Sequence, residues 1–163
     1  MKDQAADKLR GVLTRMGMGE AVVEAREDAE RVTLEVKGVE SGLLIGKHGA
    51  TLDALQYLVN KMTSREEEGT DKPIVVDTEG YRDRRAESLI ELAKRLAEKA
   101  LKTRRPVAAA PMSPADRRVM HLALANEPGL KTESEGEGAN RRLVIIPLKE
   151  GAAPAPGGTD EPT

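Results

Sequence analysis

Two glycines stand three residues apart in the stretch GLLIGKHGATLDALQYL, with a lysine and a histidine between them. The four residues are Gly46, Lys47, His48 and Gly49. They separate two apolar patterns, each of which predicts a helix. The amides of such a turn and the N-terminus of the second helix attract an anion, because they donate hydrogen bonds at the positive end of the helix dipole. Lys47 adds a mobile charge and His48 a hydrogen-bond donor, so these residues predict a phosphate-binding loop.

The spacing excludes the two common nucleotide-binding loops. The pattern GxxxxGK[ST] needs its first glycine five positions before the second, whereas Gly42 lies only four before Gly46. His48 occupies the place of the hydroxyl that binds Mg²⁺, and the pattern GxGxxG lacks its first glycine. The loop therefore suits a phosphodiester chain better than a nucleoside triphosphate. A plain linker between two helices, in which glycine only permits the turn, is the alternative that these residues leave open.

A second pair of polar residues is found in the segment ADRRVMHLAL. Arg117 and His121 are four residues apart, so on a helix their side chains share one face. Arginine binds phosphate through two parallel hydrogen bonds, and histidine donates to phosphate or stacks on a base. An ordinary surface position is the alternative for a single histidine on a helix. The pair predicts a second place where a nucleic acid is contacted.

Composition excludes several function classes. The 163 residues include 26 Lys and Arg against 28 Asp and Glu, which gives a net charge of −2. This net charge argues neither for nor against a nucleic-acid ligand, so the argument must rest on where the charges lie locally. There is no cysteine, Phe or Trp, which excludes thiolate chemistry, disulfides and a surface of several stacking rings. No His, Asp or Glu grouping has the spacing of a metal or catalytic site, so we expect no enzyme, cofactor or metal. The absence of a long apolar run or signal peptide predicts a cytoplasmic protein without membrane insertion.

Periodicity predicts a mixed α+β order of elements. The first part is expected to contain a helix at 3–16, strands at 20–26 and 31–38, helical turns at 41–45 and a helix from residue 50. Leu52, Leu55, Val59 and Met62 mark one face of that last helix. A polar loop at 63–72 and a strand at 73–80 follow. A long helix follows at 81–105, with Leu89, Leu92, Ala93, Leu96 and Ala100 on its apolar face and six basic residues against one acidic residue from Lys94 onward.

The remaining sequence predicts a smaller mixed module. Ser113, Pro114 and Asp116 are typical of a helix start, with Ser as cap, Pro in the first position and Asp as the acid of a capping box. That helix is expected to end near Asn126. Strands are predicted in LKTESE and RRLVIIP around the turn GEGAN, and the tail at 150–163 is expected to be disordered.

The order helix, strand, strand, helix, GxxG, helix, strand resembles the type II KH domain. The matching residues are Ile45 and the Gly46–Gly49 loop, followed by Thr51, Leu52 and Leu55. The resemblance implies that the loop clamps the backbone of about four single-stranded nucleotides. It also implies an aliphatic groove for the bases, which Leu34, Val36, Ile45 and Leu55 are expected to line. Such a groove needs no aromatic ring.

The capped helix with Arg117 and His121, followed by SEGEGANRRLVIIP, resembles the R-three-H domain, which is named for an Arg and a His with three residues between them. The resemblance implies that Arg117 and His121 contact single-stranded nucleic acid. Further positive charge is expected from Arg118, Arg141 and Arg142. Gly138, Ala139 and Asn140 stand where relatives often have a bulkier residue, so no stacking contribution is expected there.

The two modules in tandem resemble the bacterial Jag family, also called the SpoIIIJ-associated or KhpB proteins. We expect a type II KH domain at 1–80, a connecting basic helix at 81–105, a small α+β R-three-H domain at 106–149 and a disordered tail at 150–163. The resemblance implies a single-stranded RNA-binding protein, with single-stranded DNA as a further possible ligand. Many family members have an additional N-terminal domain, which we expect this chain to lack.

The resemblance further implies a post-transcriptional regulator or RNA chaperone linked to cell division, elongation or envelope synthesis. Self-association or pairing with a small KH-domain protein is also implied. The alternative is a protein-binding scaffold that acts through the edge of the KH sheet and the long helix, without direct RNA contact. Salt distinguishes the two, because phosphate-driven binding weakens steeply as salt rises and an apolar protein contact does not.

Overall fold

The computed structural model describes residues 1–64 and 72–149. It forms two compact units, Met1–Asp83 and Arg84–Thr163, and each is mixed helix and strand as the sequence predicts. Residues 65–71 of the predicted polar loop and the tail predicted to be disordered lie outside the described residues.

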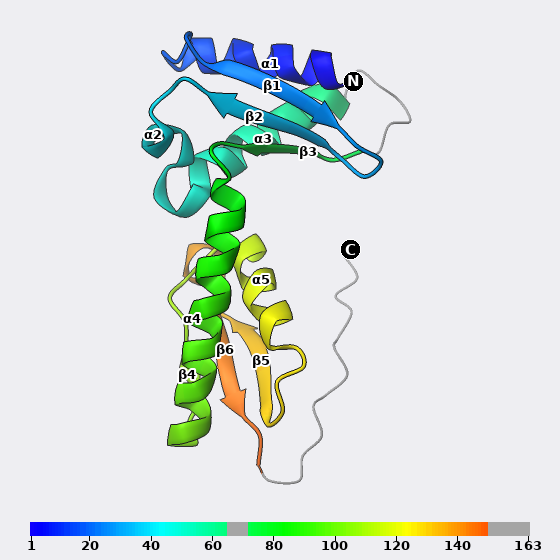
Figure 1. Cartoon of the computed structure of the whole chain (residues 1–163). Coiled ribbons are helices and arrows are strands. Elements are labelled where there is room, and N and C mark those ends of the chain that lie inside the picture. The colour runs from blue at the N-terminus through cyan, green and yellow to red at the C-terminus, as the bar shows by residue number, and fades with distance from the viewer. Residues whose placement is uncertain (65–71, 150–163) are drawn as a thin grey trace. The chain divides into compact units, whose positions relative to one another are not determined.

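The first unit is a three-stranded sheet with helices packed on it (Figure 1). In chain order its elements are α1 (Lys2–Arg15), β1 (Val22–Glu27), β2 (Val32–Lys37), α2 (Ser41–Ile45), the 3-10 turn η1 (Lys47–Gly49), α3 (Ala50–Ser64), β3 (Ile74–Asp77) and the start of α4 (Tyr81–Thr103). The strand order is β1-β2-β3, with β1 antiparallel and β3 parallel to β2. A parallel pair needs a crossover, which α2 and α3 provide. The predicted order of elements is confirmed.

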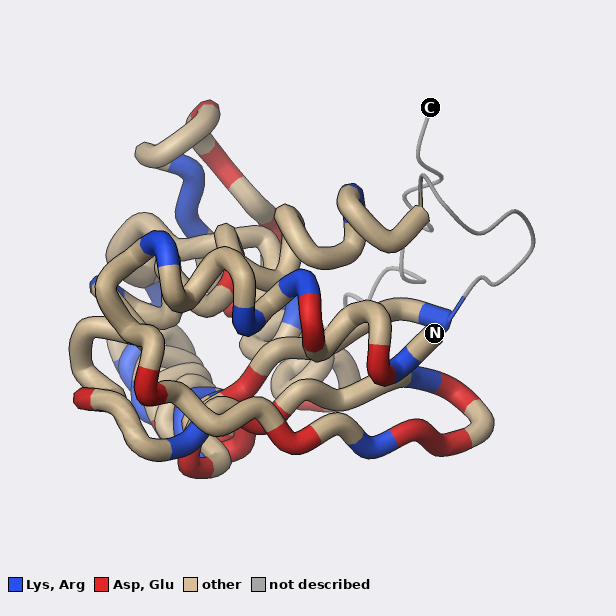
Figure 2. The backbone as a smooth tube through the Cα atoms, turned by 90° about the horizontal axis from the view of Figure 1, so that it is seen from above, with Lys and Arg blue, Asp and Glu red and all other residues tan. Residues whose placement is uncertain are grey.

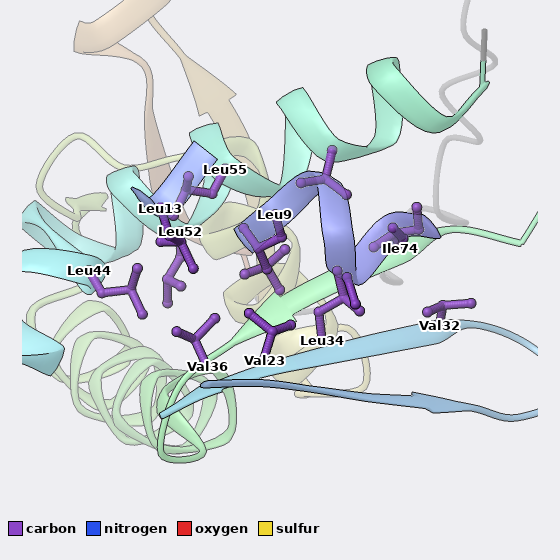
Figure 3. Packing of buried hydrophobic residues seen from close by; sticks show 14 residues of the cluster. Leu9, Leu13, Val23, Val32, Leu34, Val36, Leu44, Leu52, Leu55 and Ile74 are labelled. Carbon is purple, nitrogen blue, oxygen red and sulfur yellow. The ribbon is translucent and has the colours of Figure 1, made fainter. Parts of the chain in front are cut away.

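The core of the first unit lies between the sheet and α1 and α3 (Figure 3). Strand β2 alternates as its sequence predicts: Val32, Leu34 and Val36 are fully buried, and the residues between them are not. The helices contribute buried side chains from the same side of the sheet, which are Leu9, Leu13, Leu44, Leu52, Leu55 and Val59. The prediction that Met62 belongs to this face is wrong. Met62 is 38% exposed, and the helical position after Val59 that turns inward is Thr63.

Side chains close the outer edge of β3. Asn60 accepts a hydrogen bond from the Ile74 amide at 3.0 Å and donates to the Ile74 carbonyl at 2.7 Å. Gln56 accepts from the Val76 amide at 3.2 Å, and Nε of Arg82 donates to the Val76 carbonyl at 2.9 Å. An exposed strand edge normally offers such groups to another chain. Here α3 and the first turn of α4 occupy them.

The second unit packs two helices on an antiparallel sheet of order β4-β6-β5 (Figure 1). Its elements are most of α4, β4 (Val107–Ala108), α5 (Pro114–Leu124), β5 (Leu130–Glu135), the 3-10 turn η2 (Gly138–Asn140) and β6 (Arg142–Pro147). The buried core contains Leu89, Ala93, Ala97, Ala100, Ala109, Met120, Leu124, Leu130, Leu143 and Ile145.

Helix α4, predicted to be a connector, supplies four residues of that core. Its buried line also differs from the expected one. Ala97 is buried, whereas Leu92 and Leu96 are only half-buried at the border. Alanines let the helix approach its neighbours closely, and the larger leucines fill the margins. The domain limits drawn from the sequence remain a prediction.

Helix α5 begins as predicted, with one change. Ser113 is the cap, its Oγ accepts a hydrogen bond from the Asp116 amide at 3.2 Å, and Pro114 occupies the first position. The carboxylate of Asp116 does not serve the predicted capping box. It is bound instead by Arg85, through Nη2 at 2.7 Å and Nε at 3.3 Å, and Asp116 is only 8% exposed. A nearly buried carboxylate gains more from a guanidinium than from one further amide.

Candidate nucleic-acid interface

The Gly46–Gly49 loop turns the chain sharply between α2 and α3. Gly46 ends α2 with φ 68°, His48 has φ 54° and Gly49 has φ 86°. Positive φ is costly for residues with a Cβ, although histidine is among those that tolerate the left-handed region best. The loop thus uses glycine at two of its three left-handed positions.

Close packing gives a second reason for both glycines. A Cβ on Gly46 would lie 3.1 Å from the amide nitrogen of Thr51 and closer still to its hydroxyl. A Cβ on Gly49 would lie 2.8 Å from ring carbon Cε1 of Tyr81. Neither position has space for a side chain. Thr51 and Tyr81 therefore pack against the two glycines and restrict the conformation of the loop.

Lys47 and His48 form the tip of the loop and are exposed. In the part of the chain that the structure describes, neither side chain makes a hydrogen bond or an ion pair. The 15-residue helix α3 begins directly after them, so its positive dipole end lies at the same site, where the Ala50 amide donates to the Lys47 carbonyl. The acid in its first turn, Asp53, pairs with Nη1 of Arg82 at 3.0 Å. The tip can accept an anion without competition from that carboxylate.

The predicted aliphatic groove is wrong for three of its four residues. Leu34, Val36 and Leu55 are 0 to 2% exposed, because they fill the core under α1 and α3 (Figure 3). Ile45 is half-buried. The exposed apolar side chain nearest the loop in sequence is Leu43 of α2, at 63% exposure.

Arg117 is held beside a second arginine. Its Nη1 donates to the Met112 carbonyl at 2.9 Å, and the Met112 amide donates to the Arg141 carbonyl at 3.1 Å. Partial burial lowers the pKa of Arg117, and the positive charge of Arg141 lowers it further. A guanidinium keeps its charge at neutral pH all the same. Two neighbouring cations repel each other, and an anion between them would relieve that repulsion.

His121 is exposed on α5, and its Nδ1 contacts Oγ1 of Thr132 on β5 at 2.5 Å. This contact fixes the ring and leaves Nε2 as the nitrogen that can meet a ligand. The sequence did not single out Thr132, because its distance from His121 becomes short only when α5 packs on β5.

The other two predicted arginines are placed differently. Arg118 is exposed on α5, about 100° around the helix from Arg117. Arg142 precedes Leu143, and because the core residues are Leu143 and Ile145, alternation puts Arg142 on the opposite side of the sheet. Arg142 also lies across from Glu135 in the register. Arg117 and Arg141 therefore lie close enough to interact, whereas the side chain of Arg142 lies away from them.

Comparison with known proteins covers both units. The model of the KhpA/KhpB KH domain matches residues 6–75, and that of the R-three-H domain matches residues 87–147. The RNA-binding protein KhpB of Clostridium symbiosum is 39% identical over 151 residues, which are 92% of this chain and 68% of that protein. The chain belongs to the KhpB family. The RNA-binding protein KhpB of Bacillus subtilis is also 39% identical, over 78% of this chain and 62% of that protein. The chain thus spans about two thirds of the length of these relatives.

Membership of the KhpB family confirms the resemblance drawn from the sequence and its α+β fold. Figure 2 shows Lys and Arg interspersed with Asp and Glu along the chain, so charges of both signs are spread over the described residues. Within residues 1–64 and 72–149, no helix has the length and hydropathy needed to cross a bilayer. The described residues also contain no cluster of His, Cys, Asp or Glu arranged to hold a metal ion.

Two arginines beside the candidate interface, Arg82 and Arg85, were missed by the sequence patterns. Arg82 and Arg85 lie in the first turns of α4, where the helix dipole disfavours cations. That placement was a signal that each has a partner, and the partners are Asp53 and Asp116. Periodicity could not identify them, because both partners are distant in the sequence.

Proposed function

We propose that this chain binds single-stranded RNA through the Gly46–Gly49 loop. The observation that carries the proposal is the loop itself, in which glycine geometry holds two exposed polar side chains at the N-terminus of α3. The amides and Lys47 contact successive phosphates, and His48 donates a further hydrogen bond. Because the family relatives are named RNA-binding proteins, RNA is proposed ahead of single-stranded DNA.

A second contact is proposed at Arg117, His121 and Arg141. The paired guanidiniums favour a phosphate. When Nδ1 of His121 accepts from the Thr132 hydroxyl, Nε2 carries the proton and can donate to the same strand. Arg118 and Arg142 are kept as weaker candidates, since the geometry supports them less. Two weak contacts on one chain raise the affinity through effective concentration when one RNA reaches both.

The biological role that we propose is post-transcriptional regulation or RNA chaperone activity in the cytoplasm, linked to cell division, elongation or envelope synthesis. The resemblance to the Jag family supports this role, and it also supports pairing with a small KH-domain protein or with a second copy. The rival function is a scaffold to which a partner protein adds a strand at the edge of the KH sheet. The β3 edge cannot take such a strand, because Asn60, Gln56 and Arg82 already bind its backbone groups. A partner strand could therefore pair only with the β1 edge.

The test replaces Lys47 and His48 together by aspartate. Aspartate tolerates the left-handed conformation at position 48, so the turn is expected to persist. We expect RNA affinity to fall and the slope of log K against log salt to decrease in magnitude by about 0.7 for each phosphate that the loop no longer neutralises. Fluorescence anisotropy with a short single-stranded RNA at several salt concentrations measures both.

The matched control is Lys61→Asp with Ser64→Asp, which introduces the same two acids and removes one lysine at the other end of α3. These positions are exposed and lie about 16 Å or more along the helix from the loop, beyond a Debye length of about 10 Å at 0.1 M salt. The control should bind RNA almost as the unmodified protein does. A folded loop variant with unchanged affinity would remove the loop from the mechanism.

A further inference from the structure

The hydroxyl of Thr51 lies against the first glycine of the Gly46–Gly49 loop. Thr51 is the second residue of α3, and its Oγ1 lies within the space that a Cβ on Gly46 would need. The absent side chain at position 46 thus leaves room for a hydroxyl from the helix that follows. Gly46 directly precedes the exposed tip of the loop, so this hydroxyl lies next to the proposed phosphate contact.

The Thr51 hydroxyl makes no hydrogen bond within the described residues. Other hydroxyls in the helices donate to the carbonyl four residues back, and these belong to Thr14, Ser64, Ser88 and Thr103. At Thr51 the corresponding carbonyl is that of Lys47 in the loop, and it accepts from the Ala50 amide instead. The Thr51 hydroxyl therefore keeps its proton and its lone pairs available for a ligand.

The hydroxyl is also open to solvent, although Thr51 as a whole is half-buried. Thr63 at the other end of α3 shows the contrast, because its Oγ1 is buried without a hydrogen bond and is closed to any ligand. Oγ1 of Thr51 is not buried in this way. A molecule held at the loop can reach it.

Helix stability does not account for a threonine at position 51. The β-branched side chain has a lower helix propensity than alanine or glutamate. A capping role would require the hydroxyl to accept from an amide of the first turn, as Ser113 does in α5, and Thr51 accepts from none. Packing against Gly46 is the remaining structural reason, and valine, which has the same shape without the hydroxyl, would satisfy it equally.

We propose that the Thr51 hydroxyl donates a hydrogen bond to a phosphate oxygen of the RNA strand held by the loop. The proposal rests on the RNA binding proposed above and adds a neutral contact to it. The positive end of the α3 dipole and Lys47 favour a phosphate at this place, and the acid of the same turn, Asp53, is paired with Arg82. A hydroxyl contacts the phosphate without adding charge, so it releases no counterion.

The test compares Thr51→Val, which keeps the shape and removes the hydroxyl, with Thr51→Ser, which keeps the hydroxyl. A short oligouridylate is titrated by fluorescence anisotropy at several salt concentrations. Hydrogen bonds to charged groups are among the stronger ones, so the Kd of the valine variant should rise about tenfold, while that of the serine variant stays close to the unmodified value. The slope of log K against log salt should be unchanged in both, because no charge is removed.

Thr33→Val is the matched control in the same unit. Thr33 is half-buried, and its hydroxyl also makes no hydrogen bond within the described residues. Because Val32 and Leu34 are buried under the helices, alternation puts Thr33 on the opposite face of the sheet. Its replacement should leave RNA affinity unchanged. Thr51→Ala, which lacks the hydroxyl and has a higher helix propensity, should match Thr51→Val. Urea unfolding verifies that each variant is folded.

The outcomes separate this inference from the proposed function. An unmodified protein that binds no oligouridylate would overturn both. Unchanged affinity in Thr51→Val, together with a loss in the variant with aspartate at Lys47 and His48, would overturn only the Thr51 contact. Equal losses in Thr51→Val and Thr51→Ser would also overturn it, because packing rather than the hydroxyl would then matter. With a strand that carries 2′-fluorine in place of each 2′-hydroxyl, the Kd ratio between the valine variant and the unmodified protein should persist. A ratio that falls to one would assign the contact to the ribose and not to the phosphate.

Discussion

Replacing Gly49 by alanine tests whether the loop is shaped by its glycines. The left-handed φ of 86° costs a residue with a Cβ about 1 to 2 kcal/mol. The Cβ would also lie 2.8 Å from the Tyr81 ring, and overpacking of this kind costs about 1 to 3 kcal/mol. We therefore expect the free energy of unfolding of the first unit to fall by about 2 to 5 kcal/mol.

Gly42→Ala is the matched control within the same motif. Gly42 lies in α2, and nothing is within 4 Å of the Cβ it would gain. Alanine in a helix is favoured over glycine by about 0.5 to 1 kcal/mol, so this variant should be unchanged or more stable. A steric origin predicts, in addition, that Tyr81→Ala costs less in the Gly49→Ala background than alone.

The assay follows urea unfolding by tyrosine fluorescence. The chain has no Trp, and its two tyrosines, Tyr57 and Tyr81, both belong to the first unit, so the signal reports that unit alone. With a slope of about 1 to 3 kcal/mol per molar urea, the expected destabilisation moves the midpoint by about 0.7 M or more. Midpoints for Gly49→Ala and Gly42→Ala that agree within error would refute the steric argument.

Two further predictions concern side chains beside the candidate sites. Leu43→Ala should lower RNA affinity with little change in stability, because Leu43 is exposed. Leu44→Ala, at the fully buried neighbour, should lower the free energy of unfolding by about 2 to 5 kcal/mol. RNA titration and urea unfolding of the two variants measure this, and an unchanged affinity for Leu43→Ala would exclude Leu43 from the interface. Asp116→Ala leaves the partly buried Arg85 unpaired and should cost about 1 to 3 kcal/mol in thermal unfolding followed by circular dichroism, while Glu87→Ala, at a less buried position of α4, should cost almost nothing.

Short-range patterns predicted the elements that short-range physics determines. The start of α5 at Ser113 follows from a cap, a proline and an acid within four residues, and the structure has the helix there. The turns at Ser41–Ile45 and the alternation of β2 were predicted for the same reason. Each of these signals depends on neighbours in the sequence, so the rest of the fold does not alter it.

The errors arose where the fold decides which apolar face is covered. Alternation marked Leu34 and Val36 as apolar, but it could not tell a ligand groove from a core under two helices. On α4, the preference for large side chains favoured Leu96 over Ala97, although close helix packing buried the alanine. Thr132 and Arg85 had no local signal for their partners, since the contacts join distant segments.

The ion pairs Arg82–Asp53 and Arg85–Asp116 explain how a chain of nearly neutral net charge can present cationic sites. The helices that begin next to the two motifs carry an acid in the first turn, Asp53 in α3 and Asp116 in α5, where the dipole favours it. The same acid would repel a phosphate bound at that helix end. Arg82 binds the first acid and Arg85 the second, so the helix keeps its favourable charge and the ligand meets less repulsion. Removing either arginine should therefore weaken RNA binding although neither is proposed to touch RNA. The salt slope distinguishes such a supporting arginine from a cation that binds phosphate directly, because only removal of the latter reduces the slope.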